Sequence, residues 1–173
     1  MKEADALVPE NAPMAEALAK AVVCKEKGNA AFKMDDMALA KLSYEEGLRV
    51  LDVVDIKTKF LHHEDGKNLL ISLLGNLAIV SIKQEMWSEA ASSSSAVLEL
   101  DKRNVKAYYR RGVAYVKLGR LDEARDDLSA CIEIDPANAA AKKELAALRS
   151  ILKDLQKREE TALHASNFSK GIF

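Results

Sequence analysis

The sequence predicts an all-α protein in which pairs of helices stack into a right-handed solenoid. Glycine and proline, which favour turns, number only 7 and 3 among 173 residues, and aromatic residues make up 5%. One pattern of small and large apolar residues occurs three times along the chain. A helix pair of this size cannot bury its apolar face alone, so neighbouring pairs are expected to stack.

The first unit is expected at about 21–54, as two helices joined by a short turn. Gly28 lies in the first helix and Ala40 in the second, where small side chains let the two backbones approach closely. Met37 is expected to begin the second helix and to cover the joint. Extra residues around 52–66 are expected to lengthen the flanking helices and to add a loop at the sequence HHEDG.

The second and third units are expected at about 71–104 and 105–136, which places the three units within 11–136. The equivalents of Gly28 lie 50 and then 34 residues further along the chain, so the first interval is longer by 50 − 34 = 16 residues. Gly119 is expected between the two helices of the third unit, since glycine commonly follows a helix C-terminus. The corresponding small and large residues are Ala78, Trp87 and Ala90 in the second unit, and Gly112, Leu121 and Ala124 in the third.

Outside the repeats, residues 1–10 are expected to be a flexible leader and 137–173 a long helix with a tail. Pro136 ends the third unit and is expected to start this helix, as proline does in a first turn. Leucines at heptad-like spacing form one stripe, which is expected to cap the open end of the stack. These leucines are Leu145, Leu148, Leu152 and Leu155.

Composition excludes several classes of function. Lys plus Arg (26) nearly equals Asp plus Glu (27), so a general nucleic-acid surface is not expected. The uncharged stretch from Asn68 to Ile82 is too short to span a bilayer, so no membrane insertion is expected. Cys24 and Cys131 are expected to be buried thiols in a reducing compartment, and the N-terminus lacks the pattern of a signal peptide. These features predict a cytoplasmic protein.

The first helices of the three units carry the polar residues of interest. Residues four and seven apart share a helix face. If the faces point into one groove, three cations and two amides converge there, a set suited to holding a pair of carboxylates. The five residues are Lys25, Asn29, Asn76, Lys106 and Arg110.

The 34-residue spacing resembles the tetratricopeptide repeat, with the third unit as the best match. The sequence departs from the family pattern in the first two units, where residues of another size replace the usual ones, but the register is kept. The departures are Cys24, Ala31, Gly47, Ser94 and Lys102.

The segments KEKGNAAFK, NLA and KAYYRRG resemble the dicarboxylate-clamp class of these domains. The five residues named above match its clamp positions without departure. The resemblance implies a ligand, the Glu-Glu-Val-Asp tail of cytosolic heat-shock chaperones, with heat-shock protein 90 favoured over heat-shock protein 70. Four more residues match positions that contact upstream peptide or add an apolar wall, namely Phe32, Ile79, Ile82 and Lys83.

The insertion and the ending HASNFSKGIF resemble the C-terminal part of large FK506-binding immunophilins. Their prolyl-isomerase domain has no room in this leader, so the chain is expected to be a fragment of such an isomerase or a stand-alone adaptor and co-chaperone. A scaffold that reads a different peptide motif is the alternative binding function.

An enzyme is the alternative from another class, and His62, His63, Glu64 and Asp65 are its best candidate residues. Adjacent histidines point to different sides of a helix, and no other Cys/His cluster completes a zinc shell. The segment is therefore interpreted as a polar loop. No catalytic residue, metal or cofactor is expected.

Overall fold

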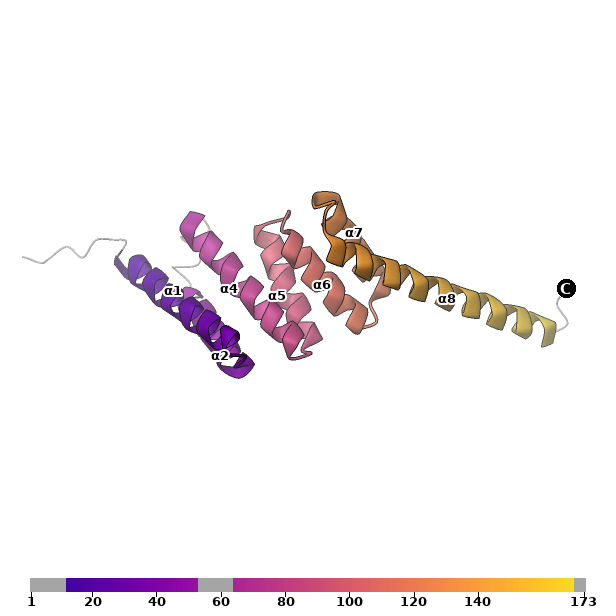
Figure 1. Cartoon of the computed structure of the whole chain (residues 1–173), viewed down its shortest axis with the longest axis horizontal. Helices are drawn as coiled ribbons and strands as arrows, with labels where there is room; N and C mark the ends of the chain where they lie inside the picture. Colours follow the sequence, from indigo (N-terminus) through magenta and orange to yellow (C-terminus); the bar gives the residue numbers. More distant parts are fainter. Residues whose placement is uncertain (1–11, 53–63, 170–173) are drawn as a thin grey trace, which may run out of the picture. The chain divides into compact units, whose positions relative to one another are not determined.

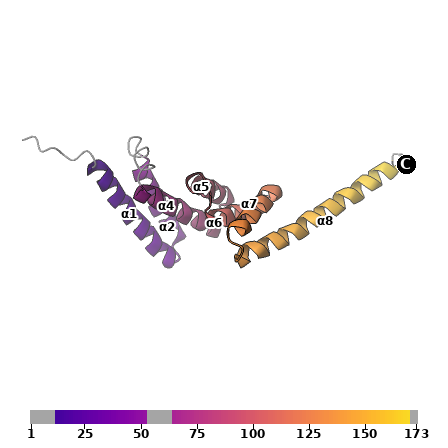
Figure 2. The same cartoon turned by 90° about the horizontal axis from the view of Figure 1, so that it is seen from above.

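The computed structural model describes residues 12–52 and 64–169, and throughout these residues it contains helices and no strands. The all-α prediction is confirmed. The helices group into two compact units, of which the first ends at Lys102 and the second begins at Arg103. Figures 1 and 2 show the helices of the two units. The predicted leader at 1–10 and most of the insertion around 52–66 lie outside the described residues.

The first unit consists of two helix pairs. Helices α1 (Ala12–Lys33) and α2 (Met37–Leu51) form one pair, and α4 (Glu64–Lys83) and α5 (Trp87–Leu100) form the other. Met37 and Trp87 begin the second helices, as predicted. The start of α4 differs from prediction, because Glu64, Asp65 and Gly66 lie in the helix and not in a loop.

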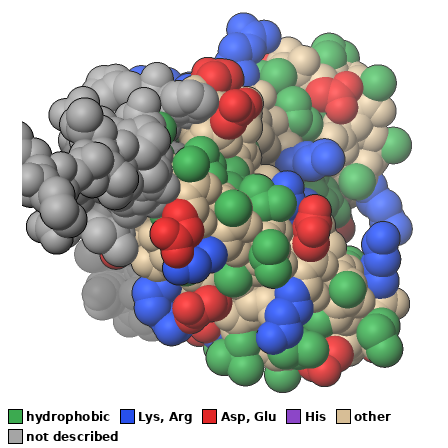
Figure 3. All heavy atoms as spheres, turned by 90° about the vertical axis from the view of Figure 1, so that its left-hand side faces the viewer, with side chains coloured by type: hydrophobic (Ala, Val, Ile, Leu, Met, Phe, Trp, Pro, Cys, Tyr) green, Lys and Arg blue, Asp and Glu red, His purple; other side chains and the backbone are tan. Residues whose placement is uncertain are grey.

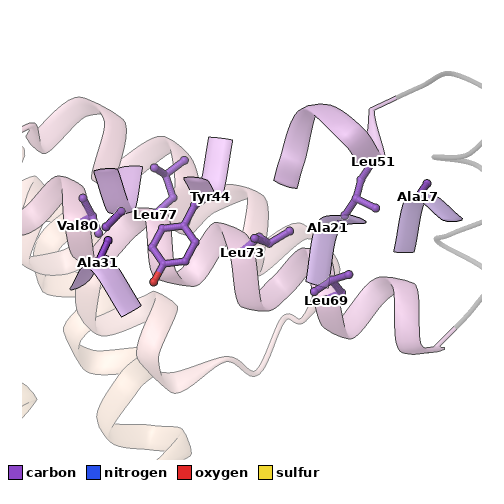
Figure 4. Close-up of a cluster of buried hydrophobic side chains, with 10 residues drawn as sticks. Ala17, Ala21, Ala31, Tyr44, Leu51, Leu69, Leu73, Leu77 and Val80 are labelled. Atoms are coloured by element: carbon purple, nitrogen blue, oxygen red, sulfur yellow. The ribbon is translucent and has the colours of Figure 1, made fainter. Parts of the chain in front are cut away.

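The core of the first unit is formed by apolar residues from α1, α2 and α4 (Figure 4). The small residues Ala40, Ala78 and Ala90 are completely buried, as their predicted role at helix contacts requires. By length and composition alone α4 could cross a membrane. Leu69, Leu73, Leu77 and Val80 belong to this core, which accounts for much of the apolar character of the helix.

The second unit consists of α6 (Val105–Lys117), α7 (Leu121–Ile134) and the long α8 (Ala139–Ser169). Gly119 lies between α6 and α7 with φ of 74°, as predicted from its place in the repeat. The carboxylate of Asp127 on α7 accepts two hydrogen bonds from the Arg111 guanidinium on α6, both 2.7 Å long. Ala124, Leu128 and Cys131 form a core with residues of α8.

Helix α8 differs from prediction in its start and in its stripe of leucines. It begins at Ala139, three residues after Pro136, because Asn138 accepts a hydrogen bond from the Ala141 amide and caps the helix. Leu145 and Leu148 are buried beside α7, whereas the Leu155 residue is 40% exposed. Figure 2 shows the reason, since α8 continues well past the end of α7.

The two cysteines differ in burial. Cys131 is completely buried, as predicted, and burial raises the pKa of its thiol. Cys24 is only half-buried in α1, so the prediction that it is buried is wrong. One of its neighbours is Gly47, where an added Cβ would lie 3.2 Å from the Cys24 Cβ.

Candidate peptide-binding site

The predicted clamp residues are divided between the two units. Lys25 and Asn29 lie on α1 and Asn76 lies on α4, all in the first unit. Lys106 and Arg110 lie on α6 in the second unit.

The two predicted amides meet in the first unit. The Asn76 Nδ2 atom donates a hydrogen bond of 2.9 Å to Asn29 Oδ1, although the two residues are 47 positions apart in the sequence. The same oxygen accepts a second hydrogen bond of 2.8 Å from the Tyr44 hydroxyl on α2. With Oδ1 engaged by two donors, the Nδ2 group is the part of the Asn29 amide suited to donate to an anionic ligand.

The position of Tyr44 depends on Gly28, the residue before Asn29. A Cβ atom at Gly28 would lie 2.4 Å from Cε1 of the Tyr44 ring, far inside van der Waals contact. Glycine therefore lets the aromatic ring pack directly on the backbone of α1. Tyr44 is 2% exposed, and burial raises the pKa of its phenol, so the hydroxyl keeps its proton near neutral pH.

Lys25 is half-buried and lies one helical turn before Asn29, on the same face of α1. It lines a cavity of about 510 Å³ between α1 and α4. Asp65, Asn68 and Ser72 of α4 line the same cavity, with apolar residues of both helices around them. One carboxylate of the chain itself thus belongs to the surroundings of this predicted cation.

The predicted secondary residues lie on the same two helices. The Lys83 ammonium group is 5.6 Å from the centroid of the Phe32 ring, a cation–π distance that connects α4 to α1. Phe32 is half-buried and packs against the core. Ile79 and Ile82 are also half-buried, and Lys83 is exposed.

In the second unit, Lys106 and Arg110 are four residues apart on α6 and therefore share a face of that helix. Lys106 is exposed and Arg110 is half-buried. Burial lowers the pKa of Arg110, but an arginine keeps its charge because its ordinary pKa lies far above neutral. The guanidinium of the adjacent Arg111 binds Asp127 and lies near the rings of Tyr108 and Tyr115.

The residues of the enzyme alternative provide no site within the described ranges. His62 and His63 lie outside them, and Glu64 and Asp65 lie in the first turn of α4. Between 12 and 52 and between 64 and 169, no three His, Cys, Asp or Glu residues are grouped as metal ligands would be. Another cavity, of about 600 Å³, contains none of the predicted site residues; leucines of α2, α4 and α5 line it together with charged residues, namely Glu45, Arg49, Asp52 and Glu99.

Sequence reasoning missed Tyr44. Its role leaves no periodic signal, because the equivalent positions in the other two units are Ser94 and Leu128, and neither of these side chains carries a long polar tip. The available signal is the tyrosine itself, at a position opposite Gly28. Because Gly28 directly precedes the predicted ligand-binding residue Asn29, a long side chain with a hydroxyl at its end indicates a polar contact there. The contact with Asn29 itself depends on helix packing and is seen only in the structure.

Comparison with known proteins identifies the repeat. A family profile described as tetratricopeptide repeat matches residues 105–138, which span α6, α7 and the following turn. FK506-binding protein 59 of Drosophila melanogaster is 34% identical over 155 residues, which are 90% of this chain and 34% of that protein. The chain thus spans about a third of the length of this relative.

Solved structures of similar domains extend the comparison. One is the C-terminal tetratricopeptide-containing domain of a putative FK506-binding protein from Plasmodium falciparum. It is 30% identical to this chain, with a TM-score of 0.74, and the match covers 83% of this chain and 95% of that one. The first such domain of Spaghetti (RPAP3), solved with the HSP90 peptide SRMEEVD, is 29% identical with a TM-score of 0.65 over 78% and 94% of the two chains. The tetratricopeptide repeat is a protein-interaction fold. The chain belongs to the tetratricopeptide-repeat family, and it is similar to the repeat domains of FK506-binding proteins.

Proposed function

We propose that this domain binds the acidic C-terminal tail of heat-shock protein 90, ending in Glu-Glu-Val-Asp, with the tail of heat-shock protein 70 as a second ligand. Two related domains support the proposal, since one was solved with the HSP90 peptide SRMEEVD and a domain of human RPAP3 with the HSP70 peptide SGPTIEEVD. Both peptides end in the same four residues. The last residue of each carries two carboxylates, one on its side chain and one at the chain end.

The observation that carries the proposal is the contact between Asn29 and Asn76. These two amides are predicted from separate repeats as donors to one ligand, and the structure joins them by a hydrogen bond. Lys25 lies one turn away on α1 and adds a positive charge near the amides. In the proposed complex, Lys106 and Arg110 of α6 complete the clamp, and Arg110 is suited to grip a carboxylate through two parallel hydrogen bonds.

The expected affinity follows from the number of charged hydrogen bonds. Each such bond contributes roughly 1.5–3 kcal/mol net. Three or four of them, less the cost of ordering a flexible peptide, give about −8 kcal/mol, which is micromolar binding. Affinity of this order allows rapid exchange, which suits a cytoplasmic co-chaperone or immunophilin adaptor that joins and leaves a chaperone.

Calorimetric titration with the peptide SRMEEVD tests the proposal. The free-acid peptide is expected to bind with micromolar affinity, and the same peptide with an amidated C-terminus is expected to lose most of the binding. Equal binding of the two forms would contradict the clamp and would favour a scaffold that reads an internal motif.

A parallel titration with SGPTIEEVD tests the preference between the two chaperones. Both peptides present the same final residues, so any difference arises from contacts with residues upstream. Phe32, Ile79, Ile82 and Lys83 are the residues of this chain proposed to make those contacts. SRMEEVD is expected to bind more tightly, and a tighter complex with SGPTIEEVD would reverse the preference while leaving the clamp intact.

A further inference from the structure

The orientation of the Asn29 amide is fixed by its two hydrogen-bond donors. Asn76 Nδ2 and the Tyr44 hydroxyl both donate to Asn29 Oδ1, at 2.9 and 2.8 Å. A side-chain amide has one oxygen and two N–H groups at its end, and rotation by half a turn exchanges them. In the observed orientation the oxygen is held inside the protein, and the N–H groups remain for an anion.

The contact with Asn76 alone does not fix this orientation. If both amides turned over together, Asn29 would donate to Asn76 and the hydrogen bond between them would be kept in reverse. The Asn29 oxygen would then face the ligand and would repel a carboxylate. The Tyr44 hydroxyl opposes this reversal, because a phenol donates a hydrogen bond more readily than it accepts one, and after the reversal it would have to accept from the Asn29 N–H group.

The phenol is well placed for this role because it cannot easily move. Tyr44 is 2% exposed, and its ring packs against the Gly28 backbone of the neighbouring helix. The same backbone leads directly into Asn29, so the tyrosine and the amide that it contacts share one rigid support. This supporting function differs from that of the predicted clamp and groove residues, which are expected to contact the ligand directly.

We propose that Tyr44 is a positioning residue, which holds the Asn29 amide with its N–H groups toward the carboxylates of a bound peptide tail. This inference rests on the proposed function. Tyr44 does not contact the ligand in this arrangement and acts through the paired amides, chiefly that of Asn29. Removing the hydroxyl is therefore expected to weaken binding while leaving the helix packing in place.

The test is Tyr44→Phe, which removes one oxygen atom and keeps the ring. SRMEEVD with a free C-terminus is expected to bind about 3- to 10-fold more weakly, the range for one neutral hydrogen bond. In an Asn29→Ala background, Tyr44→Phe is expected to cause no further loss. Tyr109→Phe is the control, because Tyr109 is a half-buried tyrosine that packs against the core of the second unit, and wild-type affinity is expected.

Two results would overturn the inference. The first is wild-type affinity in Tyr44→Phe. The second is that Tyr44→Phe reduces the affinity by the same factor in the wild-type and in the Asn29→Ala background. Asn29→Asp is a second variant, because it keeps an oxygen for Tyr44 and Asn76 but replaces the N–H groups. It is expected to keep the helical circular dichroism signal and to lose binding, so wild-type affinity would also contradict the role of the amide.

Nuclear magnetic resonance of the peptide-free protein separates this inference from the proposed function. The Asn29 side-chain amide signals are expected to shift in Tyr44→Phe and to stay in place in Tyr109→Phe. If wild-type protein fails to bind the peptide, the proposed function is wrong, yet shifted signals would still support the positioning of Asn29. Unchanged signals in Tyr44→Phe would overturn the positioning whatever the binding result.

Discussion

At the scale of single residues, the clamp proposal depends on the two cations of α6. Lys106→Ala or Arg110→Ala is expected to weaken binding of SRMEEVD by roughly 1.5–3 kcal/mol, the net contribution of a hydrogen bond to a charged group. Both residues lie on one face of α6 and lie outside the fully buried core, so the melting temperature should stay near that of wild type. Calorimetry measures the loss, with Lys142→Ala on the exposed side of α8 as the control.

The outcome for the pair distinguishes two explanations. Loss in both variants with wild-type affinity in Lys142→Ala supports direct contact with the carboxylates. Wild-type affinity in both Lys106→Ala and Arg110→Ala would remove α6 from the site and would restrict binding to the first unit.

Gly28 allows a second prediction at this scale. Gly28→Ala places a methyl group within 2.4 Å of the Tyr44 ring, which is rigid and buried. The overpacking is expected to cost about 1–3 kcal/mol of unfolding free energy and to displace the tyrosine from Asn29. Urea denaturation measures this cost.

Gly47→Ala is the matched variant for Gly28→Ala. Its new methyl group would lie 3.0 Å from a terminal methyl of Leu73 and 3.2 Å from the Cys24 Cβ, both longer than the 2.4 Å approach at Gly28. A smaller cost is therefore expected. A larger loss in Gly47→Ala than in Gly28→Ala would contradict the packing described for Tyr44.

At the scale of helices, the turns within the three pairs share one backbone feature. Asp35, Glu85 and Gly119 all have positive φ, at 62°, 58° and 74°, and occupy the same position in the repeat. The left-handed region costs a residue with a side chain about 1–2 kcal/mol, a strain that glycine avoids. Only the third pair carries glycine there, so the first two turns hold some strain.

Glu85→Gly is accordingly expected to stabilise the protein by about 0.5–1 kcal/mol, since relief of strain exceeds the added entropy of the unfolded chain. Thermal denaturation measures the change, and Glu85→Ala serves as a control that keeps the strain. A lower melting temperature in Glu85→Gly than in Glu85→Ala would show that the turn is not under strain.

The buried ion pair between α6 and α7 offers another prediction at this scale. The side chains of Arg111 and Asp127 are 22% and 7% exposed and are joined by two hydrogen bonds. Arg111→Met leaves a buried carboxylate without this partner and is expected to cost roughly 3 kcal/mol. The double variant Arg111→Met/Asp127→Leu should recover most of the stability, because it removes both charges together.

Chemical denaturation of the single and double variants measures the coupling between Arg111 and Asp127. Equal losses in Arg111→Met and in the double variant would indicate that packing, and not the unpaired charge, dominates. The same experiment shows whether the sequence RRG uses its two arginines differently, with Arg110 for the ligand and Arg111 for the helix pair.

At the scale of the whole molecule, the repeat register accounts for what could be predicted from the sequence. It located the starts of the second helices at Met37, Trp87 and Leu121, because the large apolar residue there recurs at fixed offsets. It failed where the periodicity ends. The start of α8 is set by the local cap at Asn138, and the exposure of Leu155 follows from the length of α7.

The candidate site also contains one feature that the repeat register predicts and one that it does not. Asn29 and Asn76 were predictable as a pair because equivalent helices present equivalent faces. Tyr44 was not, since its role arises from a contact through space between a ring and a glycine on another helix. A sequence pattern records which residues recur, whereas a contact made in one repeat only leaves no periodic signal.

The overall charge of the chain leads to a final prediction about the effect of salt. The formal net charge is −1, and Figure 3 shows basic and acidic side chains interspersed over the face drawn there. Attraction of an acidic tail therefore has to come from the local group of cations.

Salt at 0.1 M screens exposed charges beyond about 10 Å. The affinity for free SRMEEVD is expected to fall steadily between low and high salt in calorimetric titrations, and residual binding of the amidated peptide should change less. Affinity for the free peptide that stays constant across the salt series would show that apolar contacts, and not captured carboxylates, hold the tail.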